Sequence, residues 1–238
     1  MERELLAANL ERVRRELAEA AEGRWPVPRL VAVTKTHPLE DILPLRELGV
    51  TDVGENRVQE LREKLPALRD NFDVHLIGRL QSNKVKYIIE TVTLIHSLDR
   101  WSLAQEIDRQ AQMHGVRMPV LVQVSPAGEP QKGGMDPAEV PAFIREAAKL
   151  PGLEIRGLMA VMPDTDDEGV LLPLFRNMRT LFEQVRDEAA EGTSVTELSM
   201  GMSGDYRLAA RCGATMVRIG SAIFGPRPPM HPENQPTR

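Results

Sequence analysis

Hydrophobic and polar positions follow two different periods along the chain. Between residues 2 and 22, leucine and valine recur at helical spacings of three and four with charged residues between them, and this amphipathic pattern stops near Gly23. The next apolar run, Leu30–Val33, is short and rich in β-branched residues, and a charged, periodic segment follows it as far as Gly49. The sequence therefore predicts a helix, a first strand and a second helix, the last at Leu39–Leu48.

The same alternation continues along the rest of the chain. Seven further short apolar runs are predicted to be strands, at Thr51–Val53, Phe72–Ile77, Thr93–His96, Pro119–Val124, Ile155–Val161, Val195–Leu198 and Met216–Ile219. The helices expected between them cover about 55–65, 82–90, 100–113, 137–149, 168–190 and 204–212, with a short turn near 221. Eight strands that alternate with helices of this length are typical of parallel βα units.

Two parallel architectures fit such a pattern, the closed (β/α)8 TIM barrel and the open, doubly wound sheet. The barrel is favoured because no glycine-rich GxGxxG turn follows the first strand. A length of 238 residues is close to the roughly 250 that a barrel needs. We therefore expect one α/β domain, a TIM barrel over residues 1–225, and a loose, proline-rich tail over 226–238.

Composition and charge exclude several classes of protein. The net charge is −5, and the chain has only five Phe, two Trp and two Tyr, which is unfavourable for binding nucleic acid through phosphates or stacked bases. We find no signal peptide and no apolar run long enough to span a membrane. The single cysteine, Cys212, cannot form an internal disulfide. These features predict a cytoplasmic protein that binds neither nucleic acid nor membrane.

In a TIM barrel, the loops that follow the strands build the active site, which makes the strand ends the place to look for chemistry. Lys35 directly follows the apolar run of the first strand. Burial would lower the pKa of its amine, and a neutral amine can form a Schiff base with a carbonyl compound. The alternative reading is a solvated lysine in a loop.

A second candidate feature lies after the last two strands. Residues 201–204 and 219–221 are turns of small residues that lead into helices, and many barrels bind phosphate at these two places. Either turn alone could be a simple tight turn, whereas both together favour a phosphate site. Histidines and the lone cysteine show no spacing typical of a metal site, and Met159, Met162, Met200 and Met202 are expected to line a pocket or the core.

These segments, in this order, resemble the pyridoxal phosphate homeostasis proteins, the YggS/PROSC-like family related in fold to the N-terminal barrel of alanine racemase. The resemblance rests on VAVTKTH at 31–37, GENRVQE at 54–60, HLIGRLQSNKVK at 75–86, HSLDR at 96–100, GLMAVMP at 157–163, LSMGMSGD at 198–205 and VRIGSAIFG at 217–225. It spans nearly the whole chain. It implies the fold of type III pyridoxal phosphate enzymes without their C-terminal β domain.

The resemblance also assigns roles to individual residues. Lys35 would hold pyridoxal 5′-phosphate as a covalent aldimine, Asn56 and Met200 would lie beside the cofactor, and Arg218 would face its pyridine nitrogen. A cation at that nitrogen disfavours a protonated ring and makes the cofactor a weaker electron sink. The residues expected to hold the phosphate are Ser203, Gly220 and Ser221.

The resemblance implies that the protein is a non-catalytic, monomeric carrier that serves intracellular pyridoxal phosphate homeostasis. Related racemases take a second acid/base, a tyrosine, from an additional C-terminal domain, whereas Tyr87 and Tyr206 lie in predicted helices of this chain. Apoenzymes that need the cofactor are possible recipients. Two alternatives stay open: a racemase or lyase of the same cofactor class, and a phosphosugar enzyme that uses Lys35 for an aldolase Schiff base. The loop over 123–134 departs from the family pattern at Ser125 and Ala127.

Overall fold

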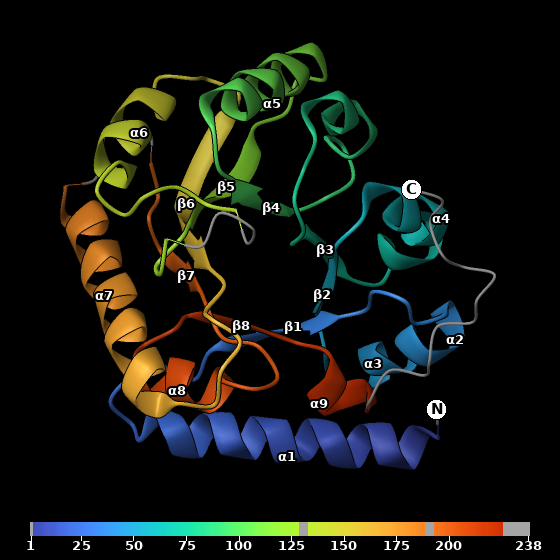
Figure 1. Cartoon of the computed structure of the whole chain (residues 1–238). Coiled ribbons are helices and arrows are strands. Elements are labelled where there is room, and N and C mark those ends of the chain that lie inside the picture. The colour runs from blue at the N-terminus through green and yellow to red at the C-terminus, as the bar shows by residue number, and fades with distance from the viewer. Residues whose placement is uncertain (1, 129–132, 189–192, 226–238) are drawn as a thin grey trace.

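Eight parallel strands close into a barrel in the order β1 to β8 in the computed structural model (Figure 1), which describes residues 2–128, 133–188 and 193–225. The single-domain barrel expected from the sequence is therefore confirmed. The strands are β1 (Arg29–Val33), β2 (Asp52–Glu55), β3 (Asp73–Leu76), β4 (Leu94–Leu98), β5 (Met118–Val124), β6 (Leu153–Ala160), β7 (Glu197–Ser199) and β8 (Met216–Ile219). All eight predicted strands are present, with ends shifted by up to two residues.

Helices surround the barrel and follow the predicted order. They are α1 (Arg3–Ala21), α2 (Leu39–Ile42), α3 (Pro44–Glu47), α4 (Val58–Leu68), α5 (Trp101–Met113), α6 (Val140–Ala147), α7 (Glu168–Asp187), α8 (Tyr206–Arg211) and α9 (Ser221–Phe224), with a 3-10 helix, η1, at Ser82–Tyr87. The predicted tail over 226–238 lies outside the described residues. No helix within the described ranges is both long and apolar enough to cross a bilayer.

Two helix predictions were wrong in detail. The single helix expected at 39–48 is split into α2 and α3, because Pro44 has no N–H to continue the first helix and instead begins the second. The helix expected at 82–90 is the shorter 3-10 helix η1, which begins with Ser82 and Asn83. Both residue types compete with the helical backbone through their own side chains, and so they disfavour a regular α-helix.

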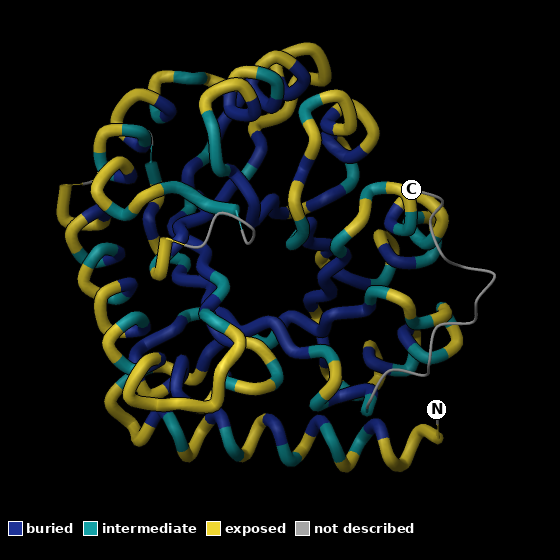
Figure 2. Tube along the Cα trace, in the orientation of Figure 1, coloured by how far each residue is buried: buried dark blue, intermediate teal, exposed yellow. Residues whose placement is uncertain are grey.

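Most of the core lies between the strands and the helices, as the buried segments in Figure 2 show. Helix α1 packs its buried face, Leu6, Leu10, Val13 and Leu17, against this core, and it contacts α8 and α9. A smaller cluster, Val31, Leu94, Leu121, Met159 and Met216, forms a second core group made by five of the strands.

Helix α1 also fixes the position of the short helix α9. Asn9 Nδ2 donates to the carbonyl of Ile223 at 2.9 Å, and Arg12 Nη2 donates to that of Ala222 at 2.8 Å. These bonds satisfy carbonyl groups at the end of α9, which would otherwise lack partners. The loop between β8 and α9 is thereby held against the barrel.

Candidate functional site

Lys35 lies immediately beyond the carboxyl end of β1 and is half-buried. Strand β1 pairs with β2 on one side and β8 on the other, with Val33 opposite Gly54 and Ala32 opposite Ile219. Two residues after Lys35, the His37 ring stacks on Phe224 of α9, with ring centroids 4.1 Å apart. The Lys35 loop is therefore held between the ends of β2 and β8.

A partly buried ion-pair cluster supports the backbone next to Lys35. Lys64 Nζ, from α4, donates to the carbonyl of Thr34 at 2.9 Å, to Glu55 Oε1 at 2.9 Å and to Glu60 Oε1 at 2.7 Å. Thr34 Oγ1 donates to Glu55 Oε1 at 2.6 Å, and the N–H of Thr36 donates to Glu60 Oε1 at 2.5 Å. These bonds anchor the residues on both sides of Lys35.

The cluster also explains an unusual backbone angle. Thr36 has φ of 68°, in the left-handed region that β-branched residues avoid, and its N–H is held by Glu60. Glu55 is fully buried, which raises its pKa, while Thr34 and Lys64 act in the opposite direction. Its Oε2 atom is buried without a hydrogen-bond partner in the described chain.

Asn56 follows β2 at the same end of the barrel and is half-buried. The next loop approaches it very closely, because a Cβ added to Gly78 would lie only 2.2 Å from the carbonyl oxygen of Asn56. Only glycine fits at such a distance. Gly78 therefore lets the loops after β2 and β3 pack against each other.

Ser203 and Gly220, both expected to hold phosphate, are in direct contact. Ser203 Oγ accepts the N–H of Gly220 and the N–H of Ala222, each at 3.2 Å. Two backbone donors thus converge on one oxygen at the start of α9, an arrangement that suits an anion. The third expected residue, Ser221, is exposed beside them.

Arg218 is buried at the carboxyl half of β8. Its Nη1 donates to Ser199 Oγ at 2.7 Å and to the Ser199 carbonyl at 2.9 Å, and its Nη2 donates to the Ala160 carbonyl at 2.8 Å. None of these three bonds uses Nε. Burial lowers the pKa of Arg218 to about 10, and Asp205 opposes that shift, so the guanidinium stays charged at neutral pH.

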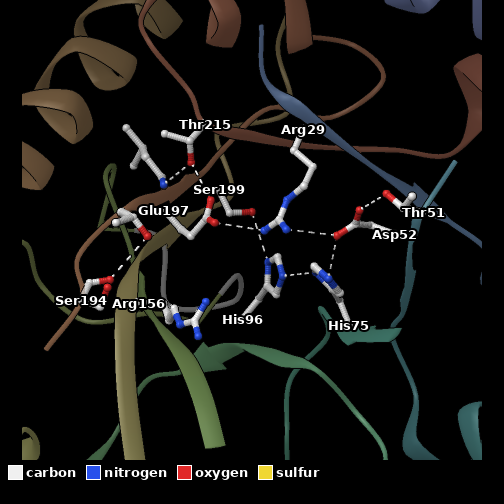
Figure 3. A network of polar contacts seen from close by, with 12 residues as sticks. Arg29, Thr51, Asp52, His75, His96, Arg156, Ser194, Glu197, Ser199 and Thr215 are labelled. Carbon is white, nitrogen blue, oxygen red and sulfur yellow. Dashed lines mark hydrogen bonds and ion pairs between the residues drawn. The ribbon is translucent and has the colours of Figure 1, made fainter. Parts of the chain in front are cut away.

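From Arg218 the polar contacts continue across the barrel interior through Ser199, His96, His75 and Asp52, the four of which are labelled in Figure 3. His96 Nδ1 lies 3.1 Å from Ser199 Oγ, His96 Nε2 lies 2.9 Å from His75 Nδ1, and His75 Nε2 lies 3.1 Å from Asp52 Oδ1. All of these side chains are buried. His75 is therefore a buried residue that contacts polar groups on both sides of its ring.

His96 and Asp52 differ in charge within this network. Burial, together with the nearby His75, Arg218 and Arg29, holds the pKa of His96 well below the ordinary 6.5, so His96 is neutral. Burial alone would raise the pKa of Asp52, but the bonds from His75 and Thr51 and the charge of Arg29 lower it overall. A cationic Arg218 and an anionic Asp52 are therefore joined by a serine and two histidines.

The seven residues proposed from the sequence gather at one end of the barrel but play unequal parts in its contacts. Met200 is fully buried, and its N–H donates to the Met216 carbonyl at 3.1 Å. Sequence reasoning missed the polar residues beneath these loops, namely the buried Thr34, Glu55, His96 and Ser199 and the partly buried Lys64. A usable signal was present in β2 and β4, where charged or histidine residues interrupt strands that are otherwise apolar.

Among the described residues, no three His, Cys, Asp or Glu side chains are grouped closely enough to hold a metal ion.

Comparison with known proteins adds independent observations. Residues 3–228 match the family model for the N-terminal domain of alanine racemase. A protein of Aquifex aeolicus named pyridoxal phosphate homeostasis protein is 39% identical over 94% of this chain and 97% of its own length. A Deinococcus radiodurans protein of the same name is 43% identical over 87% of this chain and 94% of its own length.

Solved structures give the same result. The structure of PipY from Synechococcus elongatus with PLP bound is 36% identical, covers 92% of this chain and 100% of its own, and superposes with a TM-score of 0.81. Alanine racemase from Bartonella henselae shares the fold, with a TM-score of 0.72 at 16% identity, and 59% of that chain is covered. The chain belongs to the pyridoxal phosphate homeostasis proteins, within the family of the alanine racemase N-terminal domain.

Proposed function

We propose that this protein binds pyridoxal 5′-phosphate through a Schiff base on Lys35 and serves intracellular homeostasis of that cofactor as a cytoplasmic, monomeric carrier. The observation that carries the proposal is the convergence of three kinds of group at adjoining strand ends. Lys35 follows β1, and the charged Arg218 lies on β8. Ser203 follows β7, and two backbone N–H groups from the start of α9 donate to its hydroxyl oxygen. These groups suit an aldehyde, a pyridine nitrogen and a phosphate, respectively.

The residues present fit this cofactor. Ser203, Gly220 and Ser221 would hold the phosphate, with the N–H groups of Gly220 and Ala222 as donors that now bind Ser203 Oγ. Asn56 and Met200 would lie along the ring. The bound cofactor supplies a reactive aldehyde and a ring that can accept electrons.

Arg218 favours storage over catalysis. Because its guanidinium keeps its charge at neutral pH, it would repel a proton from a pyridine nitrogen placed next to it. A ring without that proton accepts electrons poorly. Ser199 and Ala160 hold the guanidinium through three hydrogen bonds, so the cation cannot easily move away.

Neither tyrosine is well placed to serve as a second acid/base. The Tyr206 hydroxyl donates to Glu16 on α1, which lies outside the barrel, and burial together with Glu16 raises its pKa to about 12. Tyr87 is exposed on η1. Two-base racemisation needs an acid and a base on opposite faces of the substrate, and these positions do not supply the second one.

Borohydride reduction of the protein loaded with pyridoxal 5′-phosphate tests the proposal. We expect a visible absorption band and, after reduction, a mass increase on the peptide that contains Lys35. The Lys35→Ala variant should lose both while its far-ultraviolet circular dichroism stays unchanged, whereas Lys149→Ala on the exposed surface should keep both. Retention of the covalent adduct in Lys35→Ala would show that the residue is assigned wrongly.

The alternative activity is separated by a second measurement. A racemase or lyase would exchange the Cα proton of a single-enantiomer amino acid with deuterated water at enzyme-like rates. A carrier should show exchange no faster than free cofactor under the same conditions. Rapid, Lys35-dependent exchange would replace the carrier proposal with an enzymatic one.

A further inference from the structure

Two adjoining cavities lie beside the candidate cofactor site, where the loops after β2, β3 and β4 meet. Their volumes are about 630 and 370 Å3, and they share Val58, Gln59 and Lys84 in their linings. We call them together the basic groove, because arginine and lysine side chains dominate their walls. The cations that line the basic groove are Arg57, Arg62, Arg79, Lys84 and Arg100.

Four of these five cations have no carboxylate partner among the described residues: Arg57, Arg62, Arg79 and Lys84. Elsewhere on the molecule, ion pairs neutralise most of the basic side chains, including Arg3, Arg12, Arg15, Arg29, Lys64, Arg69, Arg109, Arg145, Lys149, Arg156, Arg179, Arg186 and Arg211. In a chain whose net charge is −5, these four cations form a local excess of positive charge. It stores like-charge repulsion that an anionic partner would relieve.

The acidic and aromatic side chains near the groove change this little. Glu63 is the only acidic residue that lines it in the described structure, and Asp99 pairs with Arg100. The Tyr87 ring is already occupied by cations, with Arg62 4.5 Å and Lys84 5.7 Å from its centroid. Because cations already lie over the Tyr87 ring, it is a poor stacking platform for a nucleic-acid base, which favours a protein partner over RNA or DNA.

The groove is continuous with the place where the cofactor would leave. Asn56, which lines the larger cavity, directly follows β2, and β2 pairs with β1, the strand that carries Lys35 at its end. Cations that span two cavities cover more surface than one small phosphate could contact. A macromolecule bound there would lie next to the candidate cofactor site.

We propose that the basic groove is a docking surface for an acidic patch on the apoenzyme that receives the cofactor. This inference rests on the proposed function, because it assumes that the chain holds pyridoxal 5′-phosphate at Lys35. Complementary charge chiefly accelerates encounter and orients the two proteins. Docking would bring the recipient's site next to the candidate cofactor site and limit loss of the aldehyde to the solvent.

Transfer of the cofactor to an acidic apo-aminotransferase tests the proposal. The holoprotein is mixed with the apoenzyme, and the rate of transfer is followed by recovery of aminotransferase activity over a range of apoenzyme concentrations. The test variant is Arg62→Glu/Lys84→Glu, which leaves every proposed cofactor contact in place. Its matched control is Arg24→Glu/Arg176→Glu, which makes the same change of charge at two arginines that line a separate cavity between α1 and α7 and have no ion-pair partner within the described ranges.

At low salt we expect the Arg62→Glu/Lys84→Glu variant to transfer at least about tenfold more slowly than wild type, which is the lower end of electrostatic steering. The control should stay within about twofold, since only net charge changes there. At about 0.5 M salt the three rates should converge, because screening removes steering over these distances. Absorbance of each holoprotein before mixing checks that all three carry the cofactor.

Each contrary result has a distinct meaning. If none of the three proteins, wild type included, retains the cofactor, the proposed function itself fails. If all retain it and the groove variant transfers as fast as wild type, only the docking surface is refuted. A rate independent of apoenzyme concentration would show release into solution and also refute docking. Inhibition of transfer by a short RNA, lost in the groove variant, would assign the groove to nucleic acid and overturn the proposal.

Discussion

His75 and His96 face each other inside the barrel, with Nδ1 of the first 2.9 Å from Nε2 of the second. Because His96 is neutral, only one nitrogen of its ring carries a proton. If Ser199 donates to His96 Nδ1, then His96 donates to His75, and His75 directs its own N–H at Asp52. In that arrangement the Ser199 hydroxyl determines which nitrogen of the neutral His96 ring carries the proton.

Replacement of Ser199 with alanine should disrupt this order. Ser199→Ala leaves Arg218 Nη1 and His96 Nδ1 without a hydroxyl that both contact in the buried interior. We expect a loss of about 1 to 3 kcal/mol in the free energy of unfolding by urea. Ser97→Ala is the matched control, because the buried Ser97 hydroxyl has no partner among the described residues. That variant should be neutral or slightly more stable, and equal losses in both would contradict the assigned bonds.

The neutral state of His96 predicts how stability depends on pH. Its pKa in the folded protein lies well below 6.5, so the unfolded chain binds a proton that the folded one refuses. Stability should therefore fall as the pH is lowered below about 6.5, with a contribution of up to about 1.4 kcal/mol per pH unit from this one group.

The His96→Gln variant isolates that contribution, because an amide can donate and accept hydrogen bonds but does not titrate. Urea unfolding between pH 5 and pH 7 gives the free energy of unfolding at each pH. This energy should change less steeply with pH in the variant than in wild type, by up to about 1.4 kcal/mol per pH unit, the value for one proton. His114→Gln, at a partly exposed histidine that pairs with Glu90, serves as the control for loss of a histidine. An unchanged slope in His96→Gln would mean that His96 takes up a proton in the folded barrel.

The barrel could be predicted from the sequence because its determinants are local and repeated. Each strand is a short apolar run, and each helix has its own charged face, so Leu30–Val33 and Met216–Ile219 were located to within a residue. The failures also had local causes that periodicity does not record. Pro44 divides one expected helix, and Ser82 and Asn83 disfavour a regular α-helix at the start of η1.

Only the site residues at strand ends could be predicted from the sequence, and the reason differs from that for the fold. Lys35 and Arg218 lie at strand ends, where the barrel rule directs attention. Lys64 and Glu60 belong to the ordinary-looking charged face of a helix, yet Lys64 contacts Thr34 and Glu55, and Glu60 accepts the N–H of Thr36. Their role arises from three-dimensional contacts between α4 and two strands, and no spacing along the chain encodes it.

The close approach of two loops makes Gly78 a sensitive position. A Cβ in Gly78→Ala would lie 2.2 Å from the Asn56 carbonyl oxygen, so one of the loops after β2 and β3 must shift. We expect a loss of about 1 to 3 kcal/mol in urea unfolding and weaker binding of pyridoxal 5′-phosphate, measured by absorbance titration. In Gly204→Ala the new Cβ meets no atom within 4 Å, so stability should change little. A stable, fully binding Gly78→Ala would show that the loops are adaptable.

The ion-pair cluster beneath Lys35 gives the most demanding prediction. Lys64→Met removes the cation that balances the buried Glu55, and an uncompensated buried charge costs about 3 to 5 kcal/mol. Because the pKa of Glu55 is already raised by burial, the variant should recover part of its stability as the pH is lowered and Glu55 takes up a proton. The exposed pair of Lys149 and Glu146 provides the control, since Lys149→Met should cost less than about 1 kcal/mol.

The double variant Lys64→Met/Glu55→Gln decides whether the cost comes from the unpaired charge. Glu55→Gln removes that charge while its amide oxygen can still accept the Thr34 hydroxyl, which donates to Glu55 at 2.6 Å. Urea unfolding at pH 8 should therefore show the double variant to be more stable than Lys64→Met, with a coupling of about 0.5 to 3 kcal/mol. Borohydride labelling should still fall short of wild type, because the Thr34 carbonyl lacks its Lys64 donor and the backbone beside Lys35 is less firmly held. Additive losses would instead show that Lys64 acts through packing alone.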